Sequence, residues 1–379
     1  MDYTESKLTT VKQDHVPFLQ YPSSYQDDVS RRQCLIYLIP GNPGLVAYYE
    51  PFMKTLRELL DEREKEEGCR YAFHIYGRNL LGFEDEDHEP RFGATTTSCV
   101  VTEPFTLEDQ IRGVCYGVQE VNNITLGGGR TFDQIILIGH SVGAYMVLET
   151  FHRHHQGRLD ETVWNGAGSA AAEDKSANGQ PPFPASVNLK AGILLFPTIS
   201  HIARSSSGQK LDWLRASPLL DRTAHHVARG FVGLWPRWLL GTFVRRLMGF
   251  PEHAAAATLR FLASTDGIWQ ALHMGKDEMR SITEEKWGEE LWEIEDAENC
   301  AGKGSRGLDQ TKFFFYFAKK DHWVADDCRD EFIERRKRHE KGRTKVVIDE
   351  TGIPHAFCIH HSESVAEKVK VWIEDIAGR

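Results

Sequence analysis

The sequence has no pair of cysteines spaced as CxxC, although seven cysteines occur among its 379 residues. An odd number of cysteines without such spacing argues against a disulfide framework and against a zinc site, so we expect reduced thiols and no metal. The chain also lacks an excess of basic residues. Its net charge of −10 at pH 7 argues against nucleic acid as a partner.

Two further absences narrow the class of protein. The first residues, MDYTESKLTTVKQDH, are polar and contain no apolar core of a signal peptide, so we expect no signal peptide; the reduced thiols expected above are typical of a cytosolic setting. No phosphate loop or dinucleotide fingerprint is present, because the glycine-rich GGGR at residues 127–130 precedes an expected strand instead of following one. We therefore expect no cofactor. Hydrophobic residues still make up 41% of the chain, which is enough for a substantial core.

Apolar runs and amphipathic segments alternate along the chain. The apolar runs predict buried strands at residues 34–39, 71–76, 134–138, 191–196, 312–318 and 344–349. The amphipathic segments predict helices at residues 49–63, 107–121, 144–152, 327–337 and 364–376. Strands separated by helices indicate an α/β fold, in which a mostly parallel sheet is covered by helices on both faces.

The segment QIILIGHSVGAYMVLE, residues 134–149, carries the strongest functional signal. It places a G-x-S-x-G motif between an expected strand and an expected helix, the context of a nucleophile elbow. Gly139 and Gly143 permit the sharp turn, because larger side chains there would collide with the strand and the helix. The turn exposes Ser141 at the carboxyl end of the sheet as a candidate nucleophile. A purely structural turn is the alternative interpretation.

A nucleophilic serine needs a base, and the base needs a third group that holds it. After a serine elbow of this kind, the expected chain order is an acid and then a histidine, each following a strand. Asp321 follows the strand at residues 312–318, and His355 lies in the loop after the last strand. Asp326 and Asp327 compete as acids, although an acid at the start of a helix also serves as a cap.

The loop PGNPG after the first central strand is expected to supply half of an oxyanion hole. Its useful groups are backbone N–H donors, and Pro43 has none. The N–H of Asn42 is therefore the preferred donor, with the N–H of Val142, just after the candidate nucleophile, as its partner. The loop is equally compatible with a tight turn.

Two stretches interrupt the alternation within what we expect to be a single domain, residues 1–379. Residues 165–186 are rich in Gly, Ala, Ser and Pro and predict a flexible surface insertion. Residues 200–310 form a long insertion that we expect to be a lid. Its stretch at 230–250 is apolar and aromatic but contains three arginines and a proline, so a transmembrane span is not expected. A helix lying in a lipid interface and a helix packed as a lid both fit. The expected lipid contacts are Trp235, Trp238, Leu239 and Phe243.

At this point the sequence resembles the lipid droplet-associated serine hydrolases of the α/β-hydrolase superfamily. The segments that carry the resemblance are IPGNPGLVAYYEPFMKTL (39–56), LEDQI (107–111), LIGHSVGAYM (137–146), LLFPTISHIARSSSGQKL (194–211), FAKKDHWV (317–324) and PHAF (354–357). The resemblance implies an α/β-hydrolase fold with Ser141 as nucleophile, Asp321 as acid and His355 as base. It also implies residence at lipid droplets and the cytosolic face of the endoplasmic reticulum, with lipid esters such as sterol esters or acylglycerols as substrates.

Two other functions remain open from the sequence. One is hydrolysis of a small soluble ester or thioester, against which the long apolar insertion argues. The other is a non-catalytic protein of the droplet surface that uses a hydrolase scaffold. The presence of all three residues Ser141, Asp321 and His355 argues against it.

Overall fold

The computed structural model describes residues 16–85, 88, 91–93, 103–126, 129–156, 187–210, 218–292, 312–338 and 344–378. Within these residues one seven-stranded sheet has the strand order β1-β3-β2-β4-β5-β6-β7. The strands are β1 (Phe18–Tyr21), β2 (Arg32–Ile39), β3 (Tyr71–Arg78), β4 (Gln134–His140), β5 (Leu189–Leu195), β6 (Lys312–Ala318) and β7 (Thr344–Asp349). All neighbours pair in parallel except β1, which runs antiparallel to β3 at the edge.

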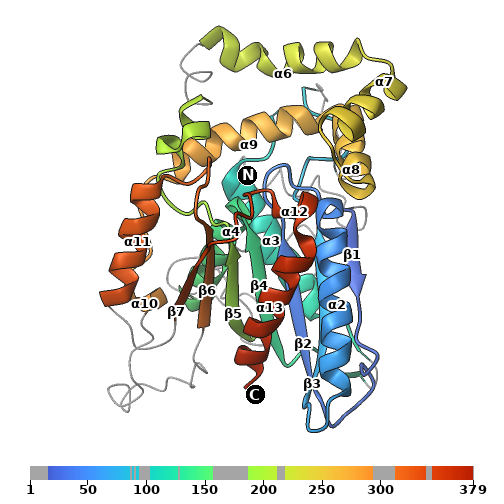
Figure 1. Ribbon diagram of the computed structural model, residues 1–379, viewed down its shortest axis with the longest axis vertical. Coiled ribbons are helices and arrows are strands. Elements are labelled where there is room, and N and C mark those ends of the chain that lie inside the picture. The colour runs from blue at the N-terminus through green and yellow to red at the C-terminus, as the bar shows by residue number, and fades with distance from the viewer. Residues whose placement is uncertain are drawn as a thin grey trace, which may run out of the picture.

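Helices cover both faces of this sheet, as Figure 1 shows. The helices α2 (Glu50–Lys65) and α13 (Ser362–Ala377) pack on one face, and α3 (Leu107–Asn122), α4 (Val142–Gln156) and α11 (Asp326–Arg338) on the other. Alternate residues of β2 supply the two cores, since Leu35 and Tyr37 face α3 and α4 whereas Cys34 and Ile36 face α2 and α13. A strand buried on both faces reads as a continuous apolar run, which is why the sequence predicted it. The expected α/β-hydrolase architecture is confirmed.

Apart from small shifts in the bounds of other elements, the expected and observed elements differ at β5 and at β1. The run at residues 191–196 was expected to be strand throughout, but β5 ends at Leu195 and Phe196 has a φ of 47°. The positive φ turns the chain sharply at the carboxyl edge of the sheet. The edge strand β1 was not expected, because its four residues are not buried and give no apolar run.

The described part of the insertion between β5 and β6 is largely helical. It contains η6 (Ile202–Arg204), α6 (Pro218–Gly233), α7 (Arg237–Thr242), η7 (Phe243–Leu247), α8 (Glu252–Ala263), α9 (Gly267–Ser281) and α10 (Glu289–Trp292). In Figure 1, α9 lies across the end of the sheet and α6 lies beyond α9. The stretch at residues 230–250 is not one helix. Pro236 separates the end of α6 from α7, since proline has no N–H to continue a helical ladder.

Among the described residues, no helix combines the length and apolar composition that crossing a membrane would require. The expected flexible insertion at residues 165–186 lies outside the described residues.

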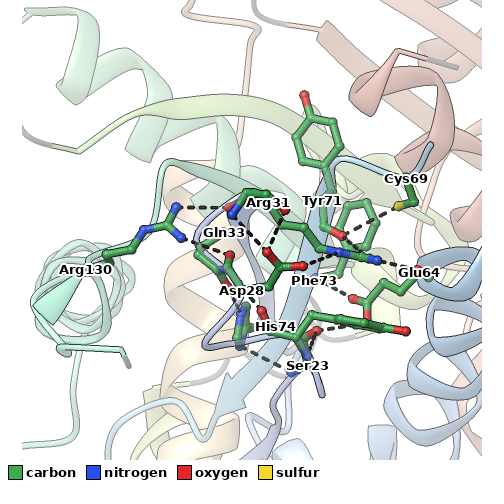
Figure 2. A network of polar contacts seen from close by, with 12 residues as sticks. Ser23, Asp28, Arg31, Gln33, Glu64, Cys69, Tyr71, Phe73, His74 and Arg130 are labelled. Atoms are coloured by element: carbon green, nitrogen blue, oxygen red, sulfur yellow. Dashed lines mark hydrogen bonds and ion pairs between the residues drawn. The ribbon is translucent and has the colours of Figure 1, made fainter. Parts of the chain in front are cut away.

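A polar network holds the opposite end of the sheet, where β2 and β3 begin (Figure 2). The buried carboxylate of Glu64, near the end of α2, accepts hydrogen bonds from Ser23 Oγ at 2.9 Å and from the N–H of Phe73 at 2.6 Å. It also pairs with Arg57 at 3.0 Å. His74 bonds Gln33 through Nε2 at 2.7 Å. The network fastens the loop before β2 and α2 to the sheet, away from the carboxyl edge where Ser141 lies.

Candidate active site

Ser141 lies in a strained turn between β4 and α4. Its φ is 56°, a left-handed value that is costly for a residue with a side chain. The flanking glycines make room for the turn. A Cβ on Gly139 would collide with the carbonyl group of Gly143, and a Cβ on Gly143 would collide with the carbonyl oxygen of Ile39. Only glycine therefore fits at these two positions, and the turn presents Ser141 at the carboxyl end of the sheet.

The structure brings Ser141, His355 and Asp321 together from three separate loops. His355 Nε2 lies 2.9 Å from Ser141 Oγ, and His355 Nδ1 lies 2.7 Å from Asp321 Oδ2. Because a carboxylate oxygen only accepts, Nδ1 carries the proton and donates to Asp321. Nε2 is then free to accept from the Ser141 hydroxyl. This is the arrangement in which an imidazole takes the proton of a serine.

The surroundings of Asp321 favour its ionised carboxylate, which accepts the hydrogen bond from the imidazole of His355. Its side chain is buried, which by itself would raise its pKa. The hydrogen bond and charge of His355, together with the N–H of Trp323, outweigh that effect and lower the pKa of the carboxyl below its ordinary value. The two acids that compete with Asp321 for the role of holding His355 form other ion pairs: Asp326 pairs with Arg329, and Asp327 pairs with Arg204. Asp321 is therefore the carboxylate that His355 contacts.

The candidate oxyanion donors are backbone N–H groups of the PGNPG loop and of the turn at Ser141. The N–H of Gly41 already donates to the hydroxyl of Tyr49 at 3.0 Å. In the part of the chain that the structure describes, the N–H groups of Asn42 and Val142 have no hydrogen-bond partner. These are the two donors expected from the sequence, and both remain available for an oxygen of a bound substrate.

His140, which the sequence did not single out, links the PGNPG loop to the loop of His355. Its Nε2 lies 2.8 Å from the carbonyl oxygen of His355, which can only accept, so Nε2 carries the proton. Its Nδ1 lies 2.6 Å from the hydroxyl of Tyr49. Burial and the neighbouring His355 lower the pKa of His140 to about 3, so the ring is neutral and Nδ1 accepts from Tyr49. One chain of hydrogen bonds therefore runs from Gly41 through Tyr49 and His140 to His355.

Glu278, on α9, is a second residue that the sequence did not indicate. The side chain of Asn42 donates to its Oε1 at 3.1 Å and to the carbonyl oxygen of Ala271 at 3.0 Å. Within the described residues Glu278 has no ion-pair partner. Burial, together with the nearby charge of Asp277, raises the pKa of Glu278 to about 8, against the opposing effect of the Asn42 hydrogen bond. The raised pKa favours the neutral carboxylic acid at pH 7, and the hydrogen bond from Asn42 ties the PGNPG loop to the insertion.

A cavity of about 450 Å³ opens in front of Ser141. Its walls come from the PGNPG loop, the loops of His322 and His355, and α9, with Thr198 at the end of β5. The hydroxyl of Thr198 is buried and has no hydrogen-bond partner among the described residues. Apolar and aromatic side chains supply much of the remaining wall, namely Tyr48, Ile202, Phe250, Leu272, Trp323 and Ile359. Such a wall suits an apolar ligand with a single polar centre.

The expected lipid contacts of the insertion divide into two pairs. Trp238 is 72% exposed and Phe243 is 38% exposed. Trp235 and Leu239 are half-buried and expose less of their surface, so the expected lipid contact of the four side chains stays a prediction. The Trp235 ring packs against Phe231 and Phe243, which covers it. Of the stretch at residues 230–250, only Phe250 is a lining residue of the Ser141 cavity, and α9 forms the wall instead.

The mostly parallel sheet, with a strained serine between β4 and α4, defines the α/β-hydrolase fold. Two of the solved structures with this fold illustrate the likeness. The juvenile hormone epoxide hydrolase of the silkworm Bombyx mori is 11% identical, with a TM-score of 0.52 over 95% of this chain and 73% of that one. The peroxisomal α/β-hydrolase Lpx1 of Saccharomyces cerevisiae is also 11% identical, with a TM-score of 0.53 over 96% and 82%. At this identity the likeness shows the fold alone.

The particular family follows from the sequence comparison. A family model described as lipid-droplet associated hydrolase matches residues 32–358, so the chain belongs to this family of hydrolases. The lipid droplet-associated hydrolase of Mus musculus is 23% identical over 92% of this chain and 87% of its own length. The protein of the same name from Dictyostelium discoideum is 22% identical over 89% and 86%. The resemblance seen in the sequence is confirmed.

Proposed function

We propose that the protein is a serine hydrolase of lipid esters, of the sterol ester or acylglycerol type, that acts at the surface of lipid droplets. The observation that carries the proposal is the hydrogen-bonded chain from Ser141 through His355 to Asp321 at the mouth of an apolar cavity. The family, whose members are named for lipid droplets, supports the location. Lipid droplets and the cytosolic face of the endoplasmic reticulum are the proposed sites of residence.

The proposed mechanism of ester cleavage uses the hydrogen bonds of this site. His355 takes the proton of Ser141 as Oγ attacks the ester carbonyl, and the carbonyl oxygen becomes an oxyanion that the N–H groups of Asn42 and Val142 bind. His355 then gives that proton to the leaving alcohol, and an acyl group remains on Ser141. His355 next takes a proton from water as the water attacks the acyl carbonyl, and it gives this proton to Oγ of Ser141 as the bond between Oγ and the acyl carbon breaks. The carboxylic acid leaves, and the serine and the neutral imidazole are restored. In this mechanism Ser141 and His355 are the residues that transfer protons.

The test is covalent labelling with a fluorophosphonate probe. Wild-type protein is expected to be labelled on Ser141, since a fluorophosphonate reacts with a serine that an imidazole activates. Ser141→Ala is expected to remain folded, as judged by circular dichroism, and to show no labelling. Labelling that persists in Ser141→Ala would reject the proposed nucleophile. Labelling of Ser141 without turnover of any lipid ester would favour a non-catalytic role at the droplet surface.

We further propose that the insertion acts as a lid whose outer side rests on lipid. A double variant, Trp238→Ser with Phe243→Ser, should move the protein from droplets to the cytosol in a fractionation assay, because exposed apolar side chains drive such contacts. Turnover of a short soluble ester should be unchanged, since neither side chain lines the Ser141 cavity. The matched control is Val29→Ser with Val371→Ser, two exposed apolar residues outside the insertion. Equal droplet association of both double variants would contradict the lipid contact.

The neutral state of Glu278 gives a prediction for the dependence of activity on pH. As pH rises through about 8, Glu278 ionises and places a negative charge beside the loop that receives the oxyanion, so wild-type turnover should fall. Glu278→Gln keeps an acceptor for Asn42 without ionising, and its turnover should not fall over this range. Asp277→Asn is the control. Removing that neighbouring charge should shift the fall to lower pH without abolishing it. An unchanged alkaline fall in Glu278→Gln would refute this role.

A further inference from the structure

A second cavity, of about 670 Å³, lies within the insertion, between the end of α6, the start of α7 and the end of α8. We call it the insertion cavity. It shares no lining residue with the cavity of Ser141. Its walls combine polar side chains with the apolar side chains of Val232, Trp235, Leu240, Leu259 and Leu262. The cavity is therefore a separate place in the molecule where a ligand with apolar parts could bind.

Three arginines, Arg229, Arg237 and Arg260, line the insertion cavity. All three are exposed. In the described residues none of their guanidinium groups forms an ion pair or a side-chain hydrogen bond. The arginines of α11 differ in this respect, since Arg329 and Arg335 pair with nearby carboxylates. Unpaired guanidinium groups around a concave site leave their donors available for an anion.

The charge of the surrounding segment opposes that of the whole protein. Residues 218–250 contain five arginines, one aspartate and no lysine or glutamate, a net charge of +4, whereas the chain carries −10. Positive charge is therefore concentrated on this part of the insertion. It would attract an anionic surface toward the insertion while the rest of the molecule is repelled.

Exposed apolar side chains lie next in sequence to residues that line the insertion cavity. Phe231, Leu234 and Trp238 are 61%, 81% and 72% exposed and come from the two helix ends and the turn that build its wall. An acidic peptide would satisfy the arginines but would leave these side chains in water. A lipid with an anionic headgroup, within a lipid layer, would pair with the arginines and would also cover the exposed apolar side chains.

We propose that the insertion cavity binds the headgroup of an anionic phospholipid in the lipid surface on which the insertion rests. The guanidinium groups of Arg229, Arg237 and Arg260 contact the phosphate, and the acyl chains run outward beside the exposed apolar side chains. The inference rests on the proposed contact with a lipid surface, and it is independent of ester hydrolysis. It adds a preference for the lipid composition of the surface, which the apolar contacts alone would not give.

The test compares two double variants that remove the same charge from the same segment. Arg229→Gln with Arg237→Gln changes the insertion cavity, whereas Arg245→Gln with Arg246→Gln changes arginines that do not line it. Binding is measured by flotation with vesicles of phosphatidylcholine alone and with vesicles that also contain phosphatidylserine. The cavity variant should lose about 30-fold in affinity for the anionic vesicles, since each arginine near such a surface contributes a factor of roughly five. Its binding to neutral vesicles should be unchanged, and the control variant should lose much less.

The outcomes separate this inference from the function on which it rests. Equal losses in the two double variants would overturn the cavity site, because attraction would then be a property of total charge. Loss of binding to neutral vesicles in Trp238→Ser tests the surface contact itself. A second measurement titrates short-chain phosphatidylserine and decanoate, each as monomers, against the wild type. Binding of decanoate as tight as that of the phospholipid would overturn the phospholipid assignment and identify a site for a released fatty acid.

Discussion

Replacing Ser141 with alanine should lower kcat for hydrolysis of a soluble p-nitrophenyl ester by about 10⁶-fold, and His355→Ala should cause a loss of similar size. In the proposed mechanism the two side chains act as one unit, because Oγ attacks only as Nε2, 2.9 Å away, takes its proton. The double variant is therefore expected to be no slower than either single variant. The residual rate would come from the N–H groups of Asn42 and Val142, which neither change removes.

The comparison needs a histidine that lies nearby but outside the proton path. His322→Ala serves this purpose, since its ring lies 5.9 Å from the ring of His355 between centroids and lines the same cavity. It should change KM more than kcat. Multiplicative losses in the Ser141 and His355 double variant would show that the two residues act separately, and the proposed mechanism would fail.

The parts of the fold that the sequence predicts are those whose burial leaves a local pattern. The strands β6 and β7 were expected at the bounds observed, Lys312–Ala318 and Thr344–Asp349. The elbow was also predictable, because its glycines are imposed by contacts within a few residues or with the adjacent strand. Edge strand β1 left no such pattern.

The missed residues depend on partners far away in the sequence. Asn42 and Glu278 are 236 positions apart, and His140 and the carbonyl of His355 are 215 positions apart. A lone histidine inside the elbow and a glutamate on an amphipathic helix carry no local sign of these contacts. The partial burial of Trp235 was not predicted either, because the rings that cover it, Phe231 in α6 and Phe243 in η7, lie on either side of Pro236.

The hydrogen bonds of Asp321 predict an unusually specific defect for Asp321→Asn. Oδ1 accepts from the N–H of Trp323 at 2.8 Å, and Oδ2 accepts from His355. In asparagine the carbonyl oxygen must keep the Trp323 N–H, so the amide NH₂ faces Nδ1 of His355. Since an NH₂ group only donates, Nδ1 has to accept, and the imidazole proton moves to Nε2. The base then presents a proton to Ser141 where it needs a lone pair.

We therefore expect Asp321→Asn to lower kcat by about 10⁴-fold while leaving KM and the fold almost unchanged. Ester kinetics and the rate of fluorophosphonate labelling should fall together, because both need the same proton transfer from Ser141. Asp326→Asn is the matched control. It changes an acid five positions along the chain that pairs with Arg329, and it should retain nearly all activity. If the two asparagine variants lost activity equally, Asp321 would be a structural anion of the loop and His355 would need another partner.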